Sequence, residues 1–208
     1  MLALLGSQTN STFHIFYDEN QRIHSNLPNY PVPADDHYLL RINCRNTRKI
    51  HELVMQYALP NQDAECKGPT GRAIEYVKVE PNDNDAKQKL GQIIKRLTER
   101  ELIPLRDIVL LVPMPLDRRF RRNFFKDDII GEQFVLSDRL DTTSTPNALT
   151  LSYIQTFKGL ERKVVILAEL ERLEPDKRQK LLYIALSRAK LHLIILGNFD
   201  DSRENKHQ

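Results

Sequence analysis

The sequence predicts an α/β fold in which helices cover both faces of a doubly wound, mostly parallel sheet. Runs of Ile, Leu and Val occupy residues 107–113, 163–170 and 190–197. Such nearly continuous apolar runs are typical of strands that are buried on both faces. Helical patterns at 85–102 and 175–189 alternate with these runs. Strands that alternate with helices of this length indicate βαβ units and therefore a parallel sheet.

The other predicted elements are shorter. A helix is expected where apolar residues recur at helical spacing, over 46–59. Further strands are expected at 12–17, 37–42, 73–79 and 149–153. The remaining segments are expected to lack regular structure: the proline-rich stretch 26–36, the turn 68–72, the variable stretch 114–148 and the polar tail 201–208.

The composition limits the class of protein. The chain has 208 residues, enough for one sizeable domain or for one domain plus a remnant of another. It is 40% hydrophobic and 28% charged, as soluble globular proteins are, and no stretch approaches the roughly 20 apolar residues of a membrane helix. Cys44 and Cys66 form neither a disulfide framework nor a metal-binding spacing. We therefore expect a cytoplasmic protein without membrane contacts.

Positive charge is concentrated in one segment. The net charge is only +3, which is compatible with nucleic-acid binding but does not indicate it. The segment RRFRRNFFK, residues 118–126, combines five cations with three phenylalanines. Its arginines could bind a phosphate backbone while the phenylalanines stack on bases. These arginines are Arg118, Arg119, Arg121 and Arg122. A solvated segment whose phenylalanines point into the core remains the alternative.

The motifs that would bind a nucleotide by themselves are missing from the sequence. It contains no GxxxxGK[ST] phosphate loop, no pair of carboxylates after an apolar strand and no metal-binding histidine spacing. Two arginines are candidates for binding an anion. Arg45 precedes a predicted helix, and Arg188 ends one. Each arginine alone is also compatible with a surface ion pair. Since ligands of such sheets bind at the carboxyl ends of strands, we expect the relevant loops to meet at that edge. These loops are 18–21, 43–47, 154–162 and 186–190.

The order of four segments carries a resemblance to a known family. The segments are FYDENQ, LLRINCRNTRKI, LTLSYIQTFKGLERKVVIL and LLYIALSRAKLHLIIL. Together they resemble the later motifs of UvrD/Rep-like superfamily 1 DNA helicases. The resemblance implies the second of two RecA-like motor domains, with a P-loop NTPase-type fold that lacks its phosphate loop. ATP with Mg²⁺ would lie between the two domains, and the first domain would supply the phosphate loop and the metal ligands.

The resemblance also implies roles for individual residues. Gln21 would sense the γ-phosphate, Arg45 would reach it from the second domain, and Arg188 would be the arginine finger. Glu161 would bind the nucleotide sugar, and Gly159 would allow the turn before it. Nucleic-acid contacts are implied for the strand and turn that carry Thr150, Tyr153, Gln155 and Lys158. The sequence departs from the family at Cys44, where an aromatic residue usually stacks on adenine, and at Tyr153 and Gln155, where threonine and histidine are usual.

Taken together, the sequence predicts four regions: a remnant of the first motor domain (1–25), a proline-rich linker (26–36), the second RecA-like domain (37–200) and a flexible tail (201–208). The expected function is that of the carboxy-terminal motor domain of an ATP-dependent, 3′ to 5′ DNA helicase. Its partners would be single-stranded or partly duplex DNA and the first motor domain, in cis or in trans. This chain alone is expected to be inactive as an ATPase. The alternative is a non-catalytic nucleic-acid or protein interaction module that has kept the helicase fold.

Overall fold

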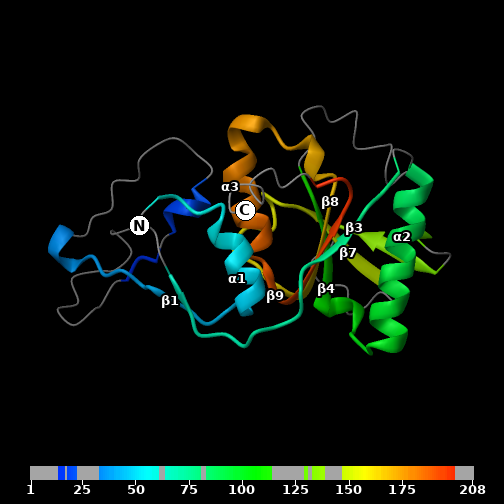
Figure 1. The fold of residues 1–208 in the computed structure, drawn as a ribbon, viewed down its shortest axis with the longest axis horizontal. Coiled ribbons are helices and arrows are strands. Elements are labelled where there is room, and N and C mark those ends of the chain that lie inside the picture. The colour runs from blue at the N-terminus through cyan, green and yellow to red at the C-terminus, as the bar shows by residue number, and fades with distance from the viewer. Residues whose placement is uncertain are drawn as a thin grey trace, which may run out of the picture.

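The computed structural model describes residues 14–16, 18–22, 33–60, 64–80, 83–113, 129–130, 133–138 and 147–199. These residues form a seven-stranded sheet with the strand order β3-β9-β8-β4-β7-β6-β5 (Figure 1). Every neighbouring pair is parallel except β5 and β6. The strands are β3 (Glu75–Val77), β4 (Ile108–Val112), β5 (Ile129–Ile130), β6 (Phe134–Ser137), β7 (Ala148–Tyr153), β8 (Arg162–Ala168) and β9 (Ala189–Leu196). The predicted α/β fold with a mostly parallel sheet is confirmed.

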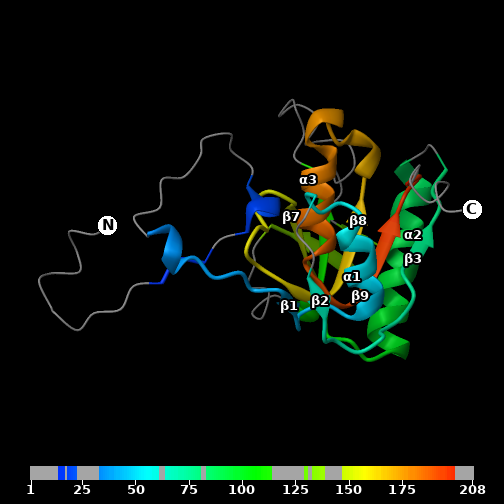
Figure 2. The ribbon, with the colours of Figure 1, turned by 60° about the vertical axis from the view of Figure 1, so that its left-hand side comes forward.

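Helices cover both faces of this sheet. Helices α1 (Arg48–Met55) and α3 (Pro175–Leu186) pack on one face, and α2 (Asp83–Lys95) packs on the other (Figure 2). The position of β4 between two cores explains why its sequence is uniformly apolar. Val109 and Leu111 point into the core under α1 and α3, whereas Ile108 and Leu110 point into the core under α2. A strand buried on both faces needs apolar residues at every position.

Two of the predicted strands lack strand structure over most or all of their described residues. The segment predicted at 37–42 is strand only at its end, where β1 (Ile42–Asn43) pairs with β2 (Glu65–Cys66) in a separate two-stranded sheet. Tyr38, Leu39 and Leu40 are 78–82% exposed. The described part of the first predicted strand, 14–16, has no regular structure. A strand-like sequence pattern becomes a strand only where a partner strand is available to it.

Strands β5 and β6 lie within the stretch that was predicted to be irregular. In β6, Phe134 and Leu136 are buried, and Val135 between them is exposed. This alternation is typical of a strand, but it covers only four residues. Most of the rest of that stretch, including 118–126, lies outside the described residues, as does the tail 201–208.

Residues 154–161 do not make a simple turn between adjacent strands. Strands β7 and β8 lie on opposite sides of β4 and are both parallel to it. This segment, here called the crossover, therefore carries the chain from the carboxyl end of β7 to the amino end of β8. Ile154 and Phe157 are fully buried under α1 and α3 and anchor the crossover on that face. Gly159 has φ +87°, a left-handed conformation that glycine adopts without strain.

Candidate functional site

Arg45, Glu161 and Arg188 come together at the amino-terminal ends of β8 and β9. Glu161 directly precedes β8, Arg188 directly precedes β9, and Arg45 lies in the loop between β1 and α1. The prediction that these residues share one edge is confirmed. The prediction that this is the carboxyl edge is wrong, because the crossover and α3 both return the chain to the amino ends of the strands that follow them.

The loop that carries Arg45 is fixed to the chain around Arg188. Asn46 is buried, and its side-chain amide donates to the carbonyls of Ser187 at 3.2 Å and Ala189 at 2.6 Å. The backbone N–H of Thr47 donates to the carbonyl of Lys190 at 3.2 Å. Two segments more than 140 residues apart in sequence are thereby held side by side.

Arg188 is almost completely buried, with 1% of its surface exposed. Its guanidinium donates to the carbonyls of Ile184 (2.9 Å) and Leu160 (3.2 Å) and to the hydroxyl of Ser187 (2.7 Å). Burial, and next the positive charge of Arg45, lower the pKa of Arg188 to about 10. The side chain is therefore a cation at neutral pH, held rigidly by neutral acceptors.

Glu161 bridges two other cations. One carboxylate oxygen lies 3.0 Å from Nε of Arg45, and the other lies 2.8 Å from Nζ of Lys190. The hydrogen bond from Lys190 is the largest of the effects that lower the pKa of Glu161, and the charges of Arg45 and Arg188 add to it. Among the described residues, two cationic side chains thus contact one carboxylate, and the charge of a third, Arg188, acts on it. Lys190 was not predicted, although its position two residues after Arg188 at the start of a strand was a usable signal.

Gln21 lies in a segment that packs against the same part of the molecule. Its side chain donates to Asp18 at 2.7 Å, and the hydroxyl of Tyr183 on α3 donates to the same carboxylate oxygen at 3.3 Å. Asn20 is buried and accepts from the backbone N–H of Leu59 at 2.6 Å. The charge of Asp18 acts on Arg188, favouring its charged form. Asp18 and Tyr183, which the sequence did not single out, therefore connect Gln21 to the arginine site.

Burial, and next the charge of Asp18, raise the pKa of Tyr183 to about 12. Its hydroxyl therefore stays protonated at neutral pH and remains a donor to Asp18.

The residues predicted to contact nucleic acid differ in exposure. Lys158 is exposed on the crossover, and Tyr153 and Gln155 are partly exposed near its start. Thr150 is fully buried in β7, so a direct contact with a bound strand would require the sheet to open there. The four arginines of 118–126 (Arg118, Arg119, Arg121 and Arg122) lie outside the described residues.

The described part of the chain contains no group of three or more His, Cys, Asp or Glu side chains that could hold a metal ion. No helix in these ranges is long and apolar enough to cross a membrane.

Comparison with known proteins supports the resemblance. Residues 149–196 match the UvrD-like helicase C-terminal domain family. The structure is similar to the C-terminal domain of a possible DNA helicase from Lactobacillus plantarum WCFS1, with a TM-score of 0.50 and 22% identity over 74% of this chain and 86% of that chain. The PRRSV helicase nsp10 has a TM-score of 0.38 and 17% identity over 79% of this chain and 25% of that chain. Comparison with curated proteins gives no match.

The matched segment contains the crossover, Glu161, Arg188 and Lys190, so it includes most of the site described above. The resemblance read from the sequence is thereby confirmed: this chain has the α/β fold of a helicase C-terminal domain and carries a UvrD-like helicase C-terminal segment at residues 149–196.

Proposed function

We propose that this chain is the second motor domain of an ATP-dependent DNA helicase that translocates 3′ to 5′, and that it shares an ATP site with a first motor domain. The observation that carries the proposal is the excess of cations at one edge of the sheet. Arg45 and Lys190 contact a single carboxylate, the charge of Arg188 acts on it as well, and Gln21 lies in a segment that packs against α3. A site with such a charge excess is suited to a polyanion such as a triphosphate.

The three cations suit different parts of phosphate binding. Arg188 is fixed by two backbone carbonyls and a hydroxyl, so its charge is already oriented for a phosphoryl group. Because only 1% of its surface is exposed, direct contact with that group would require the residues that cover it to move. Arg45 is half-exposed, and its planar fork can bind phosphate oxygens in pairs. Because the sequence has no phosphate loop or paired metal-binding acids, the first motor domain would supply them together with Mg²⁺. ATP hydrolysis by this chain alone is then negligible.

Nucleic acid would bind at the other end of the crossover. Tyr153, Gln155 and Lys158 lie at or after the carboxyl end of β7, and eight residues separate this end from β8. The buried Ile154 and Phe157 make the crossover part of the core. Movement at its nucleic-acid end would therefore be transmitted to Glu161. Thr150 would act from inside the sheet, and Arg118, Arg119, Arg121 and Arg122 would add phosphate contacts.

The experiment combines this chain with a first motor domain that carries a phosphate loop, either mixed or fused, and measures ATP turnover and single-stranded DNA binding. We expect negligible turnover by either part alone and DNA-stimulated turnover by the combination. Arg45→Ala should abolish most of this gain. Arg41→Ala, which removes an exposed arginine outside the site, is the matched control. DNA binding without any turnover in the combined protein would favour a non-catalytic module instead.

A further inference from the structure

The carboxylate of Glu161 occupies the position where an anion would be expected to bind. Its two oxygens contact two different cations, Arg45 and Lys190, at 3.0 and 2.8 Å. The sequence resemblance implies that Glu161 binds a sugar, but in this structure both carboxylate oxygens already have charged partners. A group that contacts every exposed cation of an anion site competes with the ligand of that site.

We propose that Lys190 is a third phosphate-binding cation and that Glu161 is an internal competitor, which neutralises Arg45 and Lys190 until a polyphosphate displaces it. The identification of the ligand as a nucleoside triphosphate rests on the function proposed above. The competition itself concerns the phosphate chain alone.

Repulsion among the cations explains why a neutralising group is needed. Arg45 is the second-largest cause, after burial, of the lowered pKa of Arg188, as expected of two positive charges that repel each other. Lys190 lies two residues after Arg188 and adds a third like charge. Without a carboxylate between them, the exposed side chains of Arg45 and Lys190 would move apart into solvent. Glu161 therefore holds these two cations together beside Arg188.

The ion pairs of Glu161 are also easy to open. The side chains of Arg45, Glu161 and Lys190 are 48%, 38% and 42% exposed. Ion pairs at such exposure contribute about 0–1 kcal/mol each. A polyphosphate carries several negative charges and offers paired oxygens to the arginine fork, so it can replace one carboxylate. Arg188 differs, because its hydrogen bonds to the backbone do not depend on Glu161.

The test is a calorimetric titration of the full chain with inorganic tripolyphosphate at low ionic strength. We expect Glu161→Gln to bind about fivefold more tightly, because the carboxylate that competes for Arg45 and Lys190 is lost, and Lys190→Gln about fivefold more weakly, because one exposed charge contact with the phosphates is lost. Lys190→Arg should restore binding. The ion pair between Glu174 and Lys177, at the far end of α3, provides matched controls. Glu174→Gln and Lys177→Gln should leave affinity unchanged.

Two results would overturn the inference: weaker or unchanged binding by Glu161→Gln, or unchanged binding by Lys190→Gln. Lack of tripolyphosphate binding by every variant would also overturn it. These outcomes are distinct from failure of the proposed function, which is measured as ATP turnover with the first motor domain. If the variants bind tripolyphosphate as expected but the chain gives no ATP turnover with the first motor domain, the competition by Glu161 is supported and the proposed helicase function is contradicted.

Discussion

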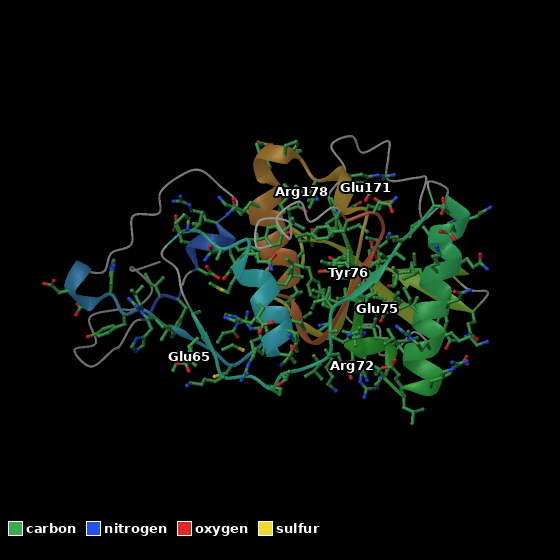
Figure 3. The ribbon with its side chains drawn as sticks, viewed as in Figure 1. Glu65, Arg72, Glu75, Tyr76, Glu171 and Arg178 are labelled. Atoms are coloured by element: carbon green, nitrogen blue, oxygen red, sulfur yellow. The ribbon has the colours of Figure 1, made fainter. Side chains whose placement is uncertain are left out.

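Two glutamates at the starts of strands are each surrounded by basic side chains, but the two clusters differ in charge balance. Glu75 begins β3 and binds Arg96 through both oxygens, at 2.8 and 2.7 Å. It also lies 3.3 Å from Nε2 of the buried His192. Arg96 and Arg72 share a second acid, Glu101 (Figure 3 labels Arg72 and Glu75). Among the described residues, this cluster pairs two arginines with two carboxylates.

Among the described residues, the two cations that contact Glu161, Arg45 and Lys190, contact no second carboxylate. Arg188 interacts with Glu161 and with Asp18 through charge alone. The cluster around Glu75, here called the balanced cluster, links β3 and β9 to the helical segment after α2. Its charges are neutralised without a ligand. The cluster around Glu161, here called the unbalanced cluster, keeps an excess of positive charge at the amino ends of β8 and β9. We therefore expect charge balance, more than the presence of ion pairs, to separate the structural cluster from the proposed ligand site.

The largest expected difference between the two clusters is in ATP turnover. In the protein with its first motor domain, Arg188→Ala should lower turnover about 10³-fold, because an arginine that stabilises the transferred phosphoryl group contributes that much. Arg188→Lys should also be impaired, since it keeps the charge but loses the fork. Arg96→Ala removes an arginine from the balanced cluster and should leave the turnover of the folded protein unchanged. Equal loss in Arg188→Ala and Arg96→Ala would remove the distinction.

Substitutions in the two clusters should affect stability in the opposite order, with the larger loss of unfolding free energy in the balanced cluster. Glu75→Gln removes hydrogen bonds to a charged, partly buried arginine and should lower the free energy of unfolding by about 1.5–3 kcal/mol. Glu161→Gln removes more exposed ion pairs and should lower it by about 1 kcal/mol or less. Urea unfolding of both variants measures this difference. A larger loss for Glu161→Gln would make its cluster the structural one.

The sequence identified the arginine site through the order of its motifs, but it did not predict the geometry. Arg45, Glu161 and Arg188 were selected correctly as neighbours, because each lies next to a strand or helix end that a pattern can locate. The edge was assigned wrongly because residues 154–161 resembled a turn. Only the strand order, with β4 between β7 and β8, shows that they cross the sheet. Asp18 and Tyr183 meet across 165 positions, a contact that no local pattern contains.

The same limit applies to the fold. Strands β4, β8 and β9 were predicted because burial on both faces makes every position apolar. Tyr38, Leu39 and Leu40 have similar apolar character, yet they are exposed and lack regular structure. Hydrophobicity indicates that a segment can be buried. Whether a partner strand is present depends on the rest of the fold.

The smallest expected effect concerns a single proton in the balanced cluster. His192 is 7% exposed and faces Glu75, Arg72 and Glu101, with Arg96 bound to both acids. Burial lowers the pKa of His192, and the charge of Glu75 opposes this effect. In the unfolded chain the imidazole binds a proton near its ordinary pKa of about 6.5. As pH falls below that value, the unfolded state takes up a proton that the folded state still excludes, so stability falls until the folded pKa is passed.

Urea unfolding at a series of pH values from about 8 to 5 measures this effect, because that pH range spans the ordinary histidine pKa. His192→Gln should flatten the stability profile below about pH 6.5, because the titrating group is gone. Glu75→Gln should steepen it, because the carboxylate that supports the protonated imidazole is lost. Glu161→Gln lies in the other cluster and should leave the slope in this range unchanged, since its carboxylate is already ionised there. A flattened profile in Glu161→Gln, or an unaltered one in His192→Gln, would show that the two clusters are not independent.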